Sequence, residues 1–307
     1  MTPDVGPTPR LEFVLGRADD VRAEAYVRLV GGPAGAAITG ALTGPRCRLA
    51  TTLPTKIPLP PLAGEGPAAA RAIITEPSFW TPELPNLYEL TAEARTAAGI
   101  VAATRQLVGL RRLGVRGRSI WLDGRRWVPR GRGLGGEPFD PARFHAESLV
   151  AVITDPTPEA CVAADTGGVA IVANFSAGCE TPKIIEQVAM LAQHPAVVMA
   201  VIPARSITMV TAARSTGTML VAVEVDAGGP PPESLMPGVD CLVARLAPCT
   251  MPTDAWRMHA PPVPIVAWRE GDGDGRRACD LLQAELAAWA IAVESRPPWD
   301  WAGYIVP

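Results

Sequence analysis

Charged and polar side chains stand at the ends of several apolar runs in the second half of this 307-residue chain. They are Arg130, Asp155, Asn174, Glu180, Arg205, Asp226, Arg245 and Glu270. If the runs are parallel strands of one barrel, these side chains gather at its carboxyl end, where barrel sites are built. Two carboxyl groups there, one protonated and one ionised, could act as general acid and nucleophile in hydrolysis. Glu270 with Asp226 or Glu180 is the pair that we consider for this chemistry.

The same residues have a second interpretation. They could form ion pairs and loop caps at the end of a barrel that does no chemistry. We favour this interpretation, because structural ion pairs readily imitate functional sites. The alternative is a remodelled barrel mouth that binds a ligand or catalyses a different reaction.

The segment 131–136 has the G-x-G-x-x-G spacing of a dinucleotide-binding turn, and Asp155 follows after a strand-like run. Pro138 and Pro141 interrupt the place where the phosphate-binding helix would begin. We therefore expect no cofactor. The segment 271–275 alternates Gly and Asp but lacks the spaced ligands of a calcium-binding loop, and we expect no metal.

Composition limits the class of protein further. The chain is 48% hydrophobic and 19% charged, so it can bury a substantial core. Its net charge of −3 offers no reason to expect a nucleic-acid partner. We see no signal peptide and no apolar stretch near the roughly 20 residues that span a bilayer. The six cysteines contain no C-x-x-C pair, which indicates neither zinc nor a disulfide framework. A reducing, cytoplasmic location is the expectation.

The pattern of apolar and turn-forming residues changes near residue 118, which divides the chain into two parts. To about residue 118, short strand-like runs are separated by Gly, Pro, Asp and Asn, which predicts an immunoglobulin-like β-sandwich. The fourth predicted strand of this domain is residues 47–53. Residues 119–307 alternate apolar runs with helical segments, which is typical of a parallel sheet covered by helices. Eight such runs predict a (β/α)₈ barrel, compact or incomplete because the usual length is about 250 residues.

Several motifs carry a resemblance to glycoside hydrolase family 2, the β-galactosidase, β-glucuronidase and β-mannosidase group. FWTPELPNLYELT (79–91) resembles the signature of the family's sandwich domain. VGLR (108–111) and LDGR (122–125) are similar to motifs at the domain junction. HPAVVM (194–199) is similar to the lead into the fourth barrel strand, and GYIV (303–306) fits the eighth. The resemblance covers Pro77 to the carboxyl terminus and implies a sandwich followed by a barrel.

The chain departs from the family pattern at the positions of the two catalytic glutamates. Arg205 stands at the position that the resemblance assigns to the acid/base glutamate, and Ala204 replaces the asparagine before it. Arg269 stands at the nucleophile position, and Glu270 follows one residue late. An arginine stays charged at neutral pH and cannot donate a proton to a glycosidic oxygen. A one-residue offset at a strand end also turns a side chain to the other face.

The resemblance and its departures together predict a catalytically degenerate relative of this family. We expect it to act as a structural or interaction subunit of a larger assembly, or as a carbohydrate-binding module. The alternative is an active glycosidase or other hydrolase that uses the relocated carboxylates Glu270, Asp226 and Glu180. A separation of about 5–9.5 Å across an open pocket would support hydrolysis.

Overall fold

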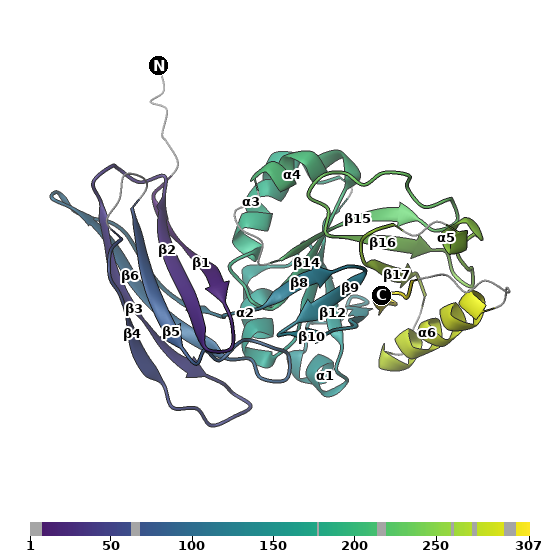
Figure 1. The fold of residues 1–307 in the computed structure, drawn as a ribbon, viewed down its shortest axis with the longest axis horizontal. Helices are drawn as coiled ribbons and strands as arrows, with labels where there is room; N and C mark the ends of the chain where they lie inside the picture. Colours follow the sequence, from purple (N-terminus) through teal and green to yellow (C-terminus); the bar gives the residue numbers. More distant parts are fainter. Residues whose placement is uncertain are drawn as a thin grey trace, which may run out of the picture. The chain divides into compact units, whose positions relative to one another are not determined.

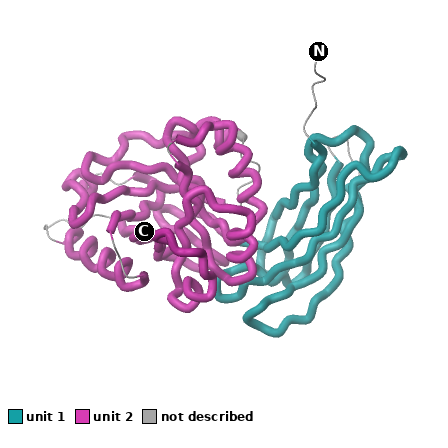
Figure 2. Tube along the Cα trace, turned by 180° about the vertical axis from the view of Figure 1, so that it is seen from behind, with its two compact units in different colours: residues 1–111 teal, residues 112–307 magenta. Residues whose placement is uncertain are grey.

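The computed structural model describes residues 8–62, 68–176, 178–213, 219–258, 261–271, 275–291 and 299–307 (Figure 1). The chain divides into two compact units, Met1–Arg111 and Arg112–Pro307 (Figure 2). The predicted division, after residue 118, falls inside a hairpin of the second unit. That hairpin joins β8 (Leu113–Arg116) to β9 (Ser119–Leu122).

The first unit contains two antiparallel sheets around one core. The first sheet has the order β1-β2-β5 and the second the order β4-β3-β6-β7. Their strands are β1 (Arg10–Ala18), β2 (Arg22–Val30), β3 (Ala37–Arg46), β4 (Thr55–Leu59), β5 (Ala69–Thr75), β6 (Leu87–Thr96) and β7 (Gly99–Val108). Side chains alternate between core and surface along β2, where Ala23, Ala25 and Val27 are fully buried. Both sheets contribute to the same core cluster, which makes this unit a β-sandwich.

The prediction of the fourth strand of the sandwich was wrong. Residues 47–53 form no strand, and β4 begins at Thr55. Pro58 lies within β4, and a proline inside a run argues against a strand unless the strand is at a sheet edge. The edge position of β4 in the order β4-β3-β6-β7 provides that exception. Leu53, which the prediction placed in a strand, is 89% exposed.

The second unit contains a closed barrel of eight parallel strands, in sequence order around the ring. They are β11 (Arg130–Gly133), β12 (Val150–Thr154), β13 (Ile171–Asn174), β14 (Val197–Ile202), β15 (Leu220–Asp226), β16 (Cys241–Leu246), β17 (Ile265–Arg269) and β18 (Gly303–Ile305). The prediction of eight strands is therefore confirmed. Apolar residues occupy nearly every position of β14, which is buried on both faces.

The helices around the barrel are mostly short. They are α1 (Pro141–Ala146), α2 (Pro158–Gly167), α3 (Thr181–Leu191), η1 (Ala204–Ser206), α4 (Ile207–Ala213), α5 (Ala255–Met258) and α6 (Gly275–Ile291). Residues 227–240, all of which are described, join β15 to β16 without a helix. Short connections between strands explain how an eight-stranded barrel fits within the second unit. The prediction of a compact barrel is in line with this. The long helix α6 lies outside the ring of strands (Figure 1).

A small hairpin sheet, in the order β10-β9-β8, precedes the barrel. The turn between β9 and β10 (Arg125–Arg126) is made by Asp123 and Gly124, which have φ of 48° and 76°. Positive φ at both central residues is the requirement of a type I′ hairpin turn, and Asp-Gly meets it at low cost. An Asp-Gly pair between two strand-like runs predicts such a turn from the sequence, and the structure confirms it, whereas β8 was not foreseen as a strand of this sheet.

Candidate functional site

An arginine joins two glutamates at the carboxyl end of the barrel. Nη1 of Arg245, on β16, lies 2.7 Å from Oε1 of Glu270, which follows β17. Its Nη2 donates to Oε1 of Glu224 on β15. The guanidinium lies 3.7 Å from the ring centroid of Trp268, and Trp268 Nε1–H donates to Glu270 Oε1 over 3.2 Å. We call these four residues the Arg245 cluster.

The register of the strands places the Arg245 cluster on the inner face of the barrel wall. In the strand register, Arg245 lies opposite Asp226 of β15 on one side and opposite Trp268 of β17 on the other. Residues at one level of a parallel sheet project from the same face, and the faces alternate along each strand. The buried Cys241, four residues before Arg245, contacts Met199 with its sulfur 4.0 Å away. Both sulfurs belong to the packed barrel interior beneath the cluster.

The cluster combines burial at its base with exposure at its rim. Trp268 is 2% exposed, whereas the side chains of Arg245, Glu224 and Glu270 are 25%, 38% and 58% exposed. The cation stacks on the indole face and satisfies both carboxylates through charge-assisted hydrogen bonds. The guanidinium thus lies between Glu224 and Glu270 and pairs with both.

Arg269 and Glu270 point in different directions. Nη1 of Arg269 pairs with Glu285 on α6, and its Nη2 donates to the Thr250 carbonyl over 2.9 Å. Arg269 therefore faces the helices outside the ring, while Glu270 faces the mouth beside Arg245. From the offset we expected the reverse, with Glu270 turned away. The strand extends to Arg269 with Trp268 inward, and alternation then returns position 270 to the inner side.

Arg205 and Glu180 lie in loops that follow β14 and β13. Arg205 is in η1, is exposed, and donates from Nη2 to the Cys179 carbonyl over 2.8 Å. Glu180 is the exposed residue before α3 and makes no side-chain cap to that helix. Arg205 thus links the segment after β14 to the loop after β13 through this hydrogen bond.

Asp226 and Asp155 stabilise turns. Asp226 Oδ1 accepts from the amide of Gly228 over 2.9 Å, and Asp155 Oδ2 accepts from the Ser176 hydroxyl over 2.7 Å. The backbone carbonyl of Asn174 accepts from the amide of Asp155. Asp226 and Asp155 thus each accept a hydrogen bond within or between the loops that follow their strands.

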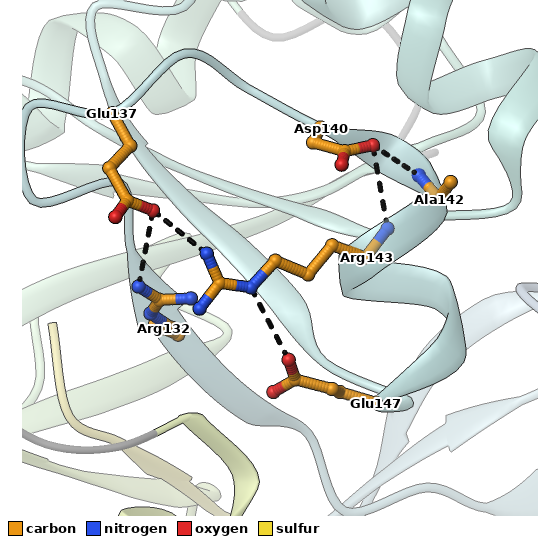
Figure 3. Close-up of polar contacts among 6 residues, drawn as sticks. All are labelled: Arg132, Glu137, Asp140, Ala142, Arg143 and Glu147. Atoms are coloured by element: carbon orange, nitrogen blue, oxygen red, sulfur yellow. Dashed lines mark hydrogen bonds and ion pairs between the residues drawn. The ribbon is translucent and has the colours of Figure 1, made fainter.

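The glycine-rich segment 131–136 builds a strand and a loop. Gly131 and Gly133 belong to β11. The following helix α1 has six residues, and its first amides donate to Asp140, as Figure 3 shows for Ala142 and Arg143. A carboxylate thus already occupies the helix end where a phosphate would bind.

Ion pairs surround the same loop. Arg143 bridges Glu137 and Glu147, and Arg132 reaches Glu137 from β11 (Figure 3). Arg130 points away from the mouth, to Asp280 and Gln283 of α6 at 2.7 and 2.6 Å.

Neither a metal site nor a membrane span emerges from the described residues. No three His, Cys, Asp or Glu side chains among them gather closely enough to hold a metal ion. Residues 272–274 of the Gly-Asp segment lie outside the described part of the chain. Within that part, no helix has the length and apolarity needed to cross a bilayer.

Two members of the Arg245 cluster were missed by sequence reasoning. Glu224 is a charged residue inside the apolar run 220–225, two positions before Asp226, so the alternation of a strand places both on one face. That charge was the available signal. Trp268 carried no such signal, because a tryptophan at the end of an apolar run is equally typical of a core.

Neither a protein-family model nor a curated protein matches this chain. Solved structures do match. A β-glucuronidase from Ruminococcus gnavus in complex with D-glucaro-d-lactam has a TM-score of 0.66 at 12% identity. The β-glucuronidase of Bacteroides uniformis has a TM-score of 0.63 at 12% identity. That of Bifidobacterium dentium, complexed with coumarin-3-O-glucuronide, has 0.60 at 13%.

These structures share the fold of this chain over nearly its whole length. The matches cover 98%, 98% and 97% of this chain, but 61%, 47% and 60% of the respective glucuronidases. The chain therefore spans about half to three fifths of the length of these proteins. At such low identity the likeness shows a family-2-like fold of sandwich and barrel, and function needs a separate argument from the site.

Proposed function

We propose that this chain is a non-hydrolytic relative of the family-2 glycosidases. It acts as a structural or interaction subunit, or as a carbohydrate-binding module. The observation that carries the proposal is the position of Arg245 between Glu224 and Glu270. The likeness to β-glucuronidases supports the ancestry of the barrel, and the Arg245 cluster supports the loss of its chemistry.

Hydrolysis of a glycosidic bond depends on the space between two carboxyl groups. A retaining glycosidase holds them about 5–5.5 Å apart with the sugar between them, and an inverting one leaves room for a water at about 6.5–9.5 Å. Here a guanidinium bonded to both glutamates occupies that place. Arg205, at the position of the acid/base residue in the resemblance, donates a hydrogen bond to a backbone carbonyl, and its guanidinium does not release a proton at neutral pH.

The exposed polar groups at the mouth support the interaction role. A barrel without a proton donor at the expected position still presents loops and an intact wall. Arg245 and the rim carboxylates offer hydrogen-bonding groups for the hydroxyls or the acid group of a bound sugar. Binding of this kind requires no change of protonation at the mouth. A protein partner in a larger assembly would use the same exposed groups.

One observation favours a second function, a hydrolase. Glu224 and Glu270 project into the same mouth from β15 and from the end of β17, and sites of barrel enzymes are built at such strand ends. A substrate that displaced Arg245 would meet two carboxylates. In that case Glu224 and Glu270 would act as the acid and the nucleophile.

An assay with aryl glycosides separates the two functions. We expect no turnover above that of Glu270→Gln, Glu224→Gln or the control Glu233→Gln, which alters an exposed loop glutamate. Turnover by the unmodified chain that both mouth variants lose, and that the control retains, would establish the hydrolase instead. Calorimetry with glucuronic acid tests the binding role, because Arg245→Gln should remove any heat that comes from the mouth.

A further inference from the structure

A cavity of about 740 Å³ lies between the second half of α6 and the wall of the barrel. Val128 lines it just before β11, and Trp299 and Trp301 line it just before β18. Apolar side chains of α6, among them Leu286 and Ile291, complete the lining. The cavity is therefore near the amino ends of these strands, whereas the Arg245 cluster is at the carboxyl end of the barrel. Its volume is within the roughly 300–1,000 Å³ of small-molecule sites.

Tyr304 of β18 turns its side chain toward α6 and so toward this cavity. In the strand register it lies opposite Arg130 of β11, and residues at one level of a parallel sheet project from the same face. Arg130 contacts Asp280 and Gln283 of α6, at 2.7 and 2.6 Å. The side chain of Tyr304 therefore lies on the α6 side of the wall, where it lines the cavity.

Two polar groups of the lining have no hydrogen-bond partner within the described part of the chain. They are the hydroxyl of Tyr304 and the indole N–H of Trp301. These two residues are only 7% and 5% exposed, so bulk water reaches little of either. Burial raises the pKa of the Tyr304 hydroxyl above its ordinary value, so the hydroxyl keeps its proton and can donate. The cavity thus has two hydrogen-bond donors for which a ligand can supply an acceptor.

Two other rings hold the indole of Trp301 in a fixed orientation. Its ring centroid is 4.9 Å from that of Trp299, edge to face, and 6.4 Å from that of Trp289 in α6. Trp299 is anchored in turn, because its Nε1–H donates to the carbonyl of Trp256 over 3.0 Å. The N–H of Trp301 is therefore preorganised, and a ligand that binds it loses little affinity to the ordering of side chains.

The charged groups of the lining are already paired with each other. Nη2 of Arg126 lies 3.9 Å from Oδ2 of Asp300, and Asp300 has a further interaction. A charged ligand would therefore meet no free counterion in the described lining, and it would lose hydration against the indole and aliphatic side chains. These conditions favour a neutral ligand.

We propose that this cavity binds a neutral ring compound that carries a carbonyl group, such as a cyclic ketone. A carbonyl oxygen has two lone pairs, so it can accept from the hydroxyl of Tyr304, from the indole N–H of Trp301, or from both. A pure hydrocarbon would leave these two donors without an acceptor, which weakens its binding. The ring of the ligand packs against the indoles of Trp299 and Trp301.

This proposal goes beyond the proposed function and does not rest on it. The cavity shares no residue with the Arg245 cluster. A failure to bind ketones would leave the non-hydrolytic interpretation of the mouth intact. Turnover of an aryl glycoside, in the same way, would leave the ketone site intact.

Isothermal titration of the full chain with 1-tetralone and with tetralin tests the proposal, because these bicyclic compounds differ chiefly in the carbonyl group. We expect 1-tetralone to bind, and tetralin to bind about tenfold more weakly. Tyr304→Phe and Trp301→Phe each remove one donor and should weaken 1-tetralone binding about three- to tenfold, the effect of one lost hydrogen bond, without weakening tetralin binding. Tyr26→Phe, which removes a hydroxyl from β2 of the sandwich, is the control and should leave both affinities unchanged.

A second pair of variants tests the location without altering a polar group. Ala290→Leu places a larger side chain in the lining and should abolish the binding of both compounds. Ala278→Leu alters the same helix away from the lining and should have no effect on binding. Thermal melting of every variant checks that the fold is intact, so that a loss of binding is assigned to the cavity.

Three results would overturn the assignment. The first is the absence of 1-tetralone binding. The second is equal affinity for 1-tetralone and tetralin, which would indicate an apolar pocket whose donors are satisfied by water. The third is 1-tetralone binding that Tyr304→Phe, Trp301→Phe and Ala290→Leu all leave unchanged, which would place the ketone elsewhere on the chain.

Discussion

Arg269 and Glu270 are neighbours in the chain and lie on opposite faces of the barrel wall. Arg269 pairs with Glu285 of α6, while Glu270 pairs with Arg245 at the mouth. Of these two consecutive residues, Arg269 thus holds α6 against the outside of the barrel, and Glu270 pairs with Arg245 at the mouth.

Arg245→Gln should destabilise the second unit by about 1–2 kcal/mol. The substitution removes a cation–π contact worth about 0.5–1 kcal/mol and leaves Glu224 and Glu270 without their shared cation. We discount the ionic part because both glutamates are more than a third exposed. Thermal melting at low and at high salt measures the effect. Equal stability of Arg245→Gln and of the surface control Arg125→Gln would contradict this.

Asp165 should be essential to the turn between α3 and β14. Its carboxylate is buried, lies 2.7 Å from Nδ1 of His194, and accepts from the amide of Ala196 over 2.8 Å. Asp165→Ala leaves those buried donors unsatisfied and should cost about 2–3 kcal/mol. Asp165→Asn retains an acceptor for Ala196 and should cost less. Chemical denaturation compares the two variants, and equal losses would contradict the hydrogen-bond explanation.

Gly131→Ala should strain the closure of the barrel. A Cβ at this position would lie 2.8 Å from Cγ1 of Ile305 and 3.1 Å from Cγ2 of Val152. Overpacking of this kind typically costs about 1–3 kcal/mol. Gly114→Ala, in β8, is the matched control, since no atom lies within 4 Å of its added methyl group. If the control lowered the melting temperature as much as Gly131→Ala, packing at the β11–β18 seam would not be the cause.

Buried thiols should resist alkylation in the native protein. Burial raises the pKa of Cys161 to about 12 and that of Cys279 to about 11. Since the thiolate is the reactive form, both should stay unlabelled by iodoacetamide at pH 8, while the exposed Cys249 reacts. Mass spectrometry of the labelled peptides provides the measurement. Prompt native-state labelling of Cys161 would show that α2 opens readily.

The same shifts predict how stability changes at high pH. The folded thiols keep their protons to a higher pH than the unfolded ones, whose pKa is close to 9. Above that value the unfolded chain binds fewer protons than the folded chain, so stability falls as the pH rises toward 11 and 12. Cys279→Ser should reduce this slope, as denaturation between pH 8 and 10.5 would reveal.

Local patterns were sufficient to predict the barrel strands. Apolar runs such as residues 196–202 are buried on both faces, and this condition produces an unbroken hydrophobic stretch. The hairpin turn at Asp123 and Gly124 was equally readable, because few residues accept positive φ. The β4 strand was missed since its edge position, which permits Pro58, depends on the order of strands in space.

The candidate site was only partly predictable. Glu270 was considered on the basis of its strand end, but its direction depends on where β17 stops. The partnership of Glu224 with Arg245 spans two strands, so it requires the register of β15 and β16. A cavity of about 740 Å³ lined by Val128, Trp299, Trp301 and residues of α6 is harder still to predict from the sequence, since its walls come from three separate segments.

The ring formed by β11 to β18 leaves none of its eight members with a vacant hydrogen-bonding side. A second polypeptide cannot lengthen that ring by adding a strand to it. The described sheets that do terminate in half-paired strands are those of the sandwich and the small β10-β9-β8 sheet. Backbone-mediated polymerisation, if this protein forms filaments, must therefore start from one of those borders.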